Sequence, residues 1–387
     1  MLAAGTAAQS SFSAVLLGLP VLAPTLRAEL DLSVSDVGVV LASLWIGPVV
    51  TLLPWGIAAD RVGERVVLAL GLALMGALVC AAALTSTAVA LVSLLGAASA
   101  AGASVNAASG RAVMSWFGRE ERGFALGVRQ SALPLGGFLS AIALPPIVHA
   151  RGLDAAFLFL GSLCLAAAAV GAVVVRDTPA GDAPVAEQAP AMLRDRRLWI
   201  LSAGGALYVA TQISLTGFLV LFLHDERGVS TGAAAAVLAA AQAVAIVLRI
   251  AAGRWSDRSQ ARIGPLRRLG VAIAASVALS AALVTASLAL LVPSLVLAGA
   301  LAMAWNGLAF TAAAELAGRA RSGTALGFQQ TSLSIAGTVA PIAFAALAEA
   351  VSWRLAFAVA AVLPLIGVVV LAALDERKVT SAEAARA

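Results

Sequence analysis

Apolar residues follow one another along this chain in blocks of about 20 or more, and short polar or charged turns separate the blocks. A helix needs about 20 apolar residues to cross the roughly 30 Å hydrocarbon layer of a membrane. The pattern therefore predicts twelve spanning helices. They cover residues 6–26, 34–58, 66–86, 88–114, 121–149, 153–175, 198–223, 231–254, 265–290, 293–316, 321–349 and 353–374.

One long interior segment breaks this pattern. RDTPAGDAPVAEQAPAMLRDRR, residues 176–197, is polar, charged and contains prolines, so it is typical of a linker. We predict an amino-terminal six-helix bundle over 1–175, the linker over 176–197, a carboxy-terminal six-helix bundle over 198–374 and a tail over 375–387. The predicted fold class is an all-α integral membrane protein.

Composition agrees with a membrane protein. Hydrophobic residues make up 61% of the chain and charged residues 12%, against about 45–50% and about 25% in soluble domains. The first charged residue is Arg27, so we interpret the amino terminus as part of the first span and not as a cleaved signal peptide. The basic residues stand at the ends of apolar blocks without interleaved aromatics, which argues against a nucleic-acid partner.

The basic residues also predict which side of the membrane each loop faces. If both termini are cytoplasmic, the outer loops hold only four of the 25 lysines and arginines, and nearly all the others fall in inner loops, the linker or the tail. This bias follows the positive-inside rule, so we expect a cell-membrane protein with both termini in the cytoplasm. The four outer residues are Arg27, Arg151, Arg227 and Arg354.

The two halves repeat each other. A shift of 200 residues places Asn106 on Asn306, Gln130 on Gln330, and the Ala-Leu-Gly triplet at 125 on the triplet at 325. Each copy holds an even number of predicted spans, so the copies share one orientation and are related by a pseudo-twofold axis along the membrane normal.

A loop sequence also occurs twice, 197 residues apart. GIAADRVGER follows the second span with Gly56, Asp60, Arg61, Gly63 and Arg65, and this loop resembles the signature of the major facilitator superfamily. GRWSDRSQAR follows the eighth span with Gln260 where the second glycine belongs, so we expect its turn to differ. The second copy keeps Gly253, Asp257, Arg258 and Arg262.

The resemblance covers the whole chain and implies the major facilitator fold. It also implies that these loops are gating latches. Asp60 would face the start of the eleventh helix and Asp257 the start of the fifth when the cytoplasmic side is closed, since a carboxylate opposes the positive end of a helix. The alternative is that the arginines of both loops are only topology signals.

Large polar side chains are unevenly distributed among the spans. Spans three, six, nine and twelve carry none beyond serine, threonine and cysteine, so we expect them to be outer supports. The remaining spans would line a central polar cavity. The predicted substrate-binding residues are Trp45, Asn106, Arg129, Gln130, Tyr208, Gln212, Trp305, Asn306, Gln329 and Gln330. The alternative for these residues is packing between helices.

Two arginines lie inside spans. Arg129 lies about 10 Å beyond Arg122, so it either snorkels to the inner surface or binds an anion in the cavity. We favour the anion, because no Asp or Glu lies in the middle of any span and its repeat partner is the uncharged Gln329. Arg249 is closer to the inner end, and we interpret it as snorkelling or bracing the second loop.

Other chemistry is not predicted. His149 and His224 lie near outer helix ends without a third ligand, so we predict no metal site. There is no phosphate-binding Gly-Lys-Ser/Thr loop, and no grouping of nucleophile and base, so we predict neither ATP drive nor enzymatic activity and no cofactor.

The sequence therefore predicts a secondary active transporter that moves a small organic solute, which we expect to be an anion, by alternating access. A proton or a counter-solute would provide the coupling, and the resemblance implies that a monomer suffices. The alternative is a proton-coupled exporter of drugs or hydrophobic compounds, which the tryptophans favour and the absence of a buried acid disfavours.

Overall fold

The computed structural model describes residues 2–108, 122–175, 195–317 and 322–374, and those residues form helices and turns without a strand. Serine and threonine caps begin several helices; Ser33, for example, forms a capping box with Asp36 at the start of α2. The helices are α1 Leu2–Glu29, α2 Val34–Val62, α3 Glu64–Ala82, α4 Ala88–Gly102, α6 Arg122–Val174, α8 Arg196–Asp225, α9 Thr231–Ser259, α10 Ile263–Ala282, α11 Leu288–Ala302, α12 Asn306–Ala317, α13 Ser322–Ala350 and α14 Trp353–Leu371.

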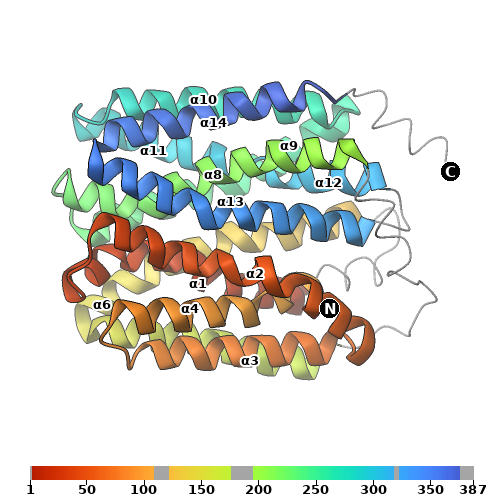
Figure 1. Cartoon of the computed structure of the whole chain (residues 1–387), viewed down its shortest axis with the longest axis horizontal. Coiled ribbons are helices and arrows are strands. Elements are labelled where there is room, and N and C mark those ends of the chain that lie inside the picture. The colour runs from red at the N-terminus through yellow and green to blue at the C-terminus, as the bar shows by residue number, and fades with distance from the viewer. Residues whose placement is uncertain (1, 109–121, 176–194, 318–321, 375–387) are drawn as a thin grey trace.

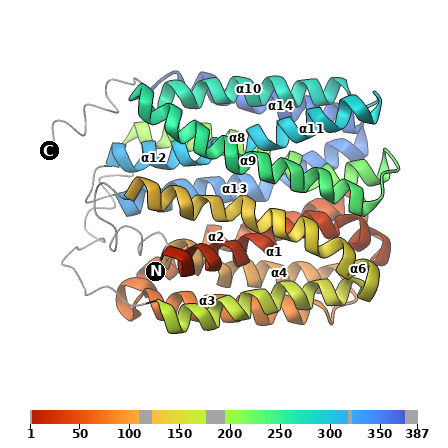
Figure 2. The same cartoon turned by 180° about the vertical axis from the view of Figure 1, so that it is seen from behind.

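The described residues contain enough long apolar helix for twelve membrane passes. Eleven segments within the described residues are long and apolar enough to span, and one of them, residues 130–174, is 45 residues long. That segment lies in α6, which is interrupted at Gly152, where φ is 80° and ψ is −179°. The chain turns back at this glycine and makes two antiparallel passes (Figure 2). The predicted number of spans is confirmed.

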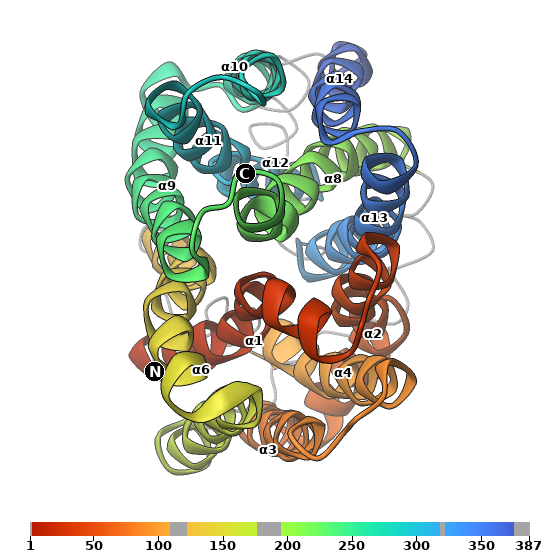
Figure 3. The ribbon, with the colours of Figure 1, turned by 90° about the vertical axis from the view of Figure 1, so that its left-hand side faces the viewer.

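The helices form two halves. Helices α1 to α6, the N half, lie below helices α8 to α14, the C half, in Figure 1. Viewed along the helices, α1 and α8 lie at the centre, and α3, the second part of α6, α10 and α14 lie at the two outer sides (Figure 3). Burial agrees for the two central helices, since 83% of an 18-residue stretch of both α1 and α8 is buried, against 56% or less in every other candidate span of the described residues.

Most predicted boundaries agree with the helices to within a few residues, and one turn was misplaced. We predicted that the ninth span ends at residue 290 and that the tenth begins at Pro293. In the structure α10 ends at Ala282, a turn follows, and α11 begins at Leu288 after Ser287. The turn is itself apolar, so hydrophobicity alone gave no boundary there. The predicted linker lies outside the described residues up to 194, and α8 already begins at Arg196, capped by Asp195.

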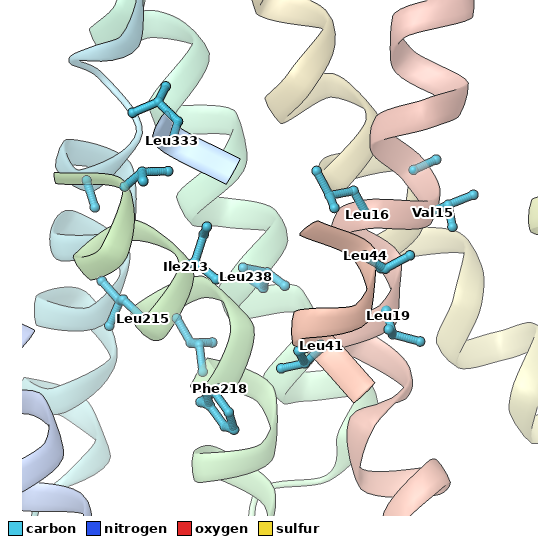
Figure 4. Packing of buried hydrophobic residues seen from close by; sticks show 14 of the residues in the cluster. Val15, Leu16, Leu19, Leu41, Leu44, Ile213, Leu215, Phe218, Leu238 and Leu333 are labelled. Carbon is cyan, nitrogen blue, oxygen red and sulfur yellow. The ribbon is translucent and has the colours of Figure 1, made fainter. Parts of the chain in front are cut away.

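Small residues let the helices approach closely. The ring of Tyr208 on α8 packs against Gly270 of α10 and Gly367 of α14, and a Cβ at Gly367 would lie 2.6 Å from Tyr208 Cε1. Close packing of this kind replaces hydrophobic attraction between helices that lie in lipid. Buried side chains of both halves join one cluster, which includes Leu19, Leu41 and Phe218 (Figure 4).

Substitution of Gly270 by alanine tests this packing. The new methyl group would overlap Tyr208 Oη, so we expect Gly270→Ala to destabilise the purified protein by about 1–3 kcal/mol. Thermal unfolding in detergent, followed by tryptophan fluorescence, measures the change. The matched control is Gly232→Ala on α9, where a Cβ meets nothing within 4 Å. Equal unfolding temperatures for the two variants would contradict this account.

Candidate functional site

The two halves meet along two seams that the internal repeat relates to each other. In the first seam, Trp45 of α2 packs on Gly337 of α13, and a Cβ at Gly337 would lie 2.5 Å from Trp45 Cδ2. In the second, Gln242 of α9 packs on Gly137 of α6, where a Cβ would lie 2.8 Å from Gln242 Nε2. Positions 137 and 337 are 200 residues apart, and positions 45 and 242 are 197 apart, the offset of the two repeated loops.

Charged and polar groups join the halves at the end of the bundle opposite to the start of α1, here called the far end. Arg27 at the end of α1 forms an ion pair with Asp225 at the end of α8. The backbone N–H of Ser35 donates to Glu349 Oε2 of α13 over 2.8 Å. Gly38 of α2 lies against Pro341 and Ala345 of α13. The far end is therefore closed.

At the other end, where α1 begins and α14 ends, several glycines have free space around them. We call this the terminal end. A Cβ added to Gly56 of α2, Gly253 of α9, or Gly323 or Gly327 of α13 would meet nothing within 4 Å.

Both halves contain an interrupted helix at equivalent positions. The helix α4 ends before Ala103 and helical conformation resumes at residues 104–108, while α11 and α12 are separated by residues 303–305. Such breaks free backbone carbonyls within the membrane, which then need other donors. In the N half, the carbonyl of Ala100 accepts from Thr51 Oγ1 over 2.8 Å and from Trp55 Nε1 over 2.7 Å.

In the C half the donor at the break is a buried arginine. Arg249 of α9 is 9% exposed. Its Nε donates to the Met303 carbonyl over 2.6 Å and its Nη2 to Asn306 Oδ1 over 2.9 Å. Its Nη1 crosses to the N half and donates to the carbonyl of Gln130 over 2.5 Å. One guanidinium therefore links α9, the helix break and α6.

This geometry corrects our interpretation of Arg249. We expected it to snorkel or to brace the second loop, but it is buried and bound to three oxygens in the seam between the halves. A depth estimate from the nearest helix end could not reveal this, because the acceptor carbonyl becomes available only through the break after α11. One sequence signal could have pointed to a special role for Arg249: the equivalent positions of the N half hold no arginine, so the fold alone does not require one there.

Three more predicted residues meet at the same break. Trp305 is fully buried, and its Nε1 donates to Gln212 Oε1 over 3.2 Å. Its ring meets that of Tyr208 edge-on, with centroids 5.6 Å apart. The Tyr208 hydroxyl donates to the Leu266 carbonyl of α10 over 3.3 Å, so it points into the C half. A substrate role for these residues stays a prediction.

The remaining predicted substrate residues are dispersed. Asn106 follows the N-half break and is partnered. Gln329 of α13 is fully buried, and neither of its amide atoms has a hydrogen-bond partner. Gln330 is half-buried, and its carbonyl accepts from Ser334 Oγ over 2.9 Å. The backbone of Arg129 belongs to α6, but its side chain lies outside the described residues.

The repeated loops differ in backbone, as expected. Gly63 between α2 and α3 has φ 90° and ψ 158°, a conformation nearly restricted to glycine. Gln260 at the end of α9 has φ 48° and ψ 36°, a left-handed conformation that other residues can adopt. This difference was predicted from the glutamine alone. Arg61, Arg65 and Arg258 are exposed.

The latch roles of Asp60 and Asp257 stay predictions. The side chain of Asp60 lies outside the described residues. Asp257 pairs within the C half with Arg262, at 2.6 Å between Oδ1 and Nη1, and Arg262 also pairs with Glu315 of α12 at 2.9 Å. Burial lowers the pKa of Arg262, but the hydrogen bonds to Glu315 and Asp257 outweigh it and hold this pKa above its usual value.

A groove of 530 Å³ between α10 and α14 is a different kind of surface. Alanines and aliphatic residues line it, and Arg354 stands at one end. It lies between outer helices of the C half (Figure 3). Its lining offers almost no polar group, so the seam around Arg249 is the better candidate for binding a polar solute.

Twelve passes in two halves that repeat each other, joined around interrupted helices, are typical of the fold of secondary transporters. The sequence profile of the Major Facilitator Superfamily matches residues 3–341. The chain belongs to this superfamily, and it is a multi-pass membrane transporter and not an enzyme.

Known proteins resemble the chain over most of its length. An uncharacterized MFS-type transporter of Mycobacterium tuberculosis is 32% identical over 91% of this chain and 79% of its own length. The probable sulfoacetate transporter of Cupriavidus necator is 27% identical over 85% and 82%. A bacterial homologue of the human lysosomal transporter Spinster, solved inward-facing and occupied, has a TM-score of 0.76 at 16% identity and covers 96% and 95%.

The ion pair at the far end can be tested by charge exchange. Its side chains are 38% and 19% exposed, so we expect Arg27→Ala or Asp225→Ala to weaken far-end closure by up to about 1 kcal/mol, roughly a fivefold population shift. Spin labels at the exposed residues Glu29 and Ala233 would report longer distances in either variant. The exchanged pair Arg27→Asp with Asp225→Arg should restore the wild-type distance. If either single variant does not lengthen the distance, the ion pair does not help to close the far end.

Proposed function

We propose that this protein is a secondary active transporter for a small organic anion. The observation that carries the proposal is the buried guanidinium of Arg249 in the seam between the halves. A charged arginine at the centre of a membrane helix costs about 2.5–3.5 kcal/mol on insertion scales. Side chains of this kind mark substrate or ion pathways when they face the interior of a helical bundle.

The partners of Arg249 support an anionic ligand. All three acceptors are neutral oxygens, and none of the described residues offers it a carboxylate. Among the described residues, the positive charge is therefore solvated but not neutralised. A carboxylate or sulfonate could accept two parallel hydrogen bonds from the guanidinium, which is the geometry that guanidinium favours.

The probable sulfoacetate transporter among the relatives supports the same substrate class. Sulfoacetate is a small organic acid with a sulfonate and a carboxylate. Arg129 stays a second candidate charge partner, because no Asp or Glu lies in the middle of any predicted span.

Alternating access follows from the two seams. We propose that the terminal end is the cytoplasmic side, as the arginine distribution predicts, and that the described structure is the inward-open state. Closure would bring Asp60 and Asp257 to the opposite half while the pair Arg27–Asp225 separates. A proton or counter-solute would supply the energy, and one chain would be the transporting unit.

Arginine variants test the proposed charge partners. Charge-assisted hydrogen bonds contribute about 1.5–3 kcal/mol, so Arg249→Gln and Arg129→Gln should each slow sulfoacetate uptake into proteoliposomes by roughly 10- to 150-fold. Arg249→Lys keeps the charge but not the fork and should retain part of the activity. Thermal unfolding shows whether each variant is folded.

Normal anion uptake by folded Arg249→Gln and Arg129→Gln would refute both assigned roles. If wild-type protein instead moves lipophilic cations and no organic anion, the exporter alternative replaces this proposal.

A further inference from the structure

The seam between α6 and α9 contains a second polar residue whose hydrogen-bonding capacity is unused. Gln242 is fully buried, and neither its Nε2 nor its Oε1 has a partner. A buried amide without a partner is destabilising, so native proteins rarely keep one without a reason. Its amide nitrogen lies against Gly137 of α6, on the face of the seam.

The position of Gln242 is defined by the register of the two helices. Arg249 contacts residue 130 and Gln242 contacts residue 137, so both contacts are seven residues apart on both helices. Seven residues are about two helical turns, or roughly 10 Å. Arg249 and Gln242 therefore reach toward α6 from the same face of α9, at two levels of one seam.

An apolar patch lies between these two levels. Leu17, Ala245, Ala300 and Met303 form a small separate cluster, and Leu133 and Leu248 pack against it. The seam thus presents a charged donor at one end, aliphatic surface in the middle and a neutral amide at the other end. This order matches a short organic acid with a second polar group.

The repeat shows that packing does not require an amide here. The equivalent position of the N half is Trp45, which fills the same place against Gly337 with an aromatic ring. A large apolar side chain would serve the contact, and it would leave no amide unsatisfied. The N-half seam is therefore sealed by an indole, while the C-half seam keeps a donor and an acceptor.

We propose that Gln242 is a specificity-determining ligand for the substrate, and that the substrate is a bifunctional anion. Its acidic group binds Arg249 and replaces the Gln130 carbonyl, its short carbon chain lies on the apolar patch, and its second carboxylate, hydroxyl or similar group binds Gln242. This inference rests on the proposed function and narrows the class of anion. Opening of the seam admits the substrate.

Competition for sulfoacetate uptake in proteoliposomes tests the inference. The probes are sulfoacetate, which has two polar groups, and methanesulfonate and acetate, which have one each. For Gln242→Leu we expect a roughly 10- to 150-fold higher KM for sulfoacetate, because one hydrogen bond to an ionised group is lost. Inhibition by methanesulfonate should not change. The variant should also unfold at a higher temperature, because it no longer buries an unpartnered amide.

The matched control is Ser202→Ala on α8. It removes a different buried polar group without a partner, a hydroxyl, and should leave the KM unchanged. An unchanged KM for sulfoacetate in Gln242→Leu would overturn the inference. It would indicate that the amide is hydrogen-bonded to an ordered water and not to the substrate. An equal loss for sulfoacetate and methanesulfonate would overturn it too, because the effect would then not depend on the second group. Absence of any anion transport by wild-type protein would instead refute the proposed function. If Gln242→Leu does not fold, Gln242→Asn provides the same comparison.

Discussion

The structure depends on how one permanent positive charge is accommodated between two apolar halves. Arg249 stays protonated at neutral pH, and water does not reach most of its guanidinium. The helix break after α11 supplies a carbonyl, Asn306 supplies an amide oxygen, and α6 supplies a second carbonyl. These three neutral oxygens solvate the charge, and because one of them belongs to the N half, they also hold the halves together.

The two seams are related by the internal repeat, but they differ in polarity, and the Arg249 contact is part of that difference. In the seam of α2 with α13, an indole lies on a glycine, and the contact is apolar. In the seam of α6 with α9, an amide lies on the equivalent glycine, and a guanidinium follows two turns later. The first seam is suited to sealing, and the second is suited to exchanging protein oxygens for the oxygens of a ligand.

Sequence reasoning was strongest where hydrophobicity or backbone geometry decides the structure. The spans, including the boundary between 149 and 153, follow from apolar length, and the different turn at Gln260 follows from the missing glycine. It was weaker where an interaction depends on register between distant helices. Nothing in the local sequence shows that Arg249 donates to the carbonyl of residue 130, or that the Trp305 N–H donates to Gln212 inside the C half. Those contacts arise from packing of both halves, so only the structure could place them.

The central claim is that an organic anion replaces the Gln130 carbonyl on Arg249 and so releases the seam. The most direct measurement is the distance between spin labels at Leu135 of α6 and Val247 of α9, which are both exposed, with and without saturating sulfoacetate. The account predicts that the distance distribution shifts to longer values in wild-type protein and does not change in Arg249→Gln. An unchanged distribution in wild-type protein, under conditions where sulfoacetate is bound, would contradict it.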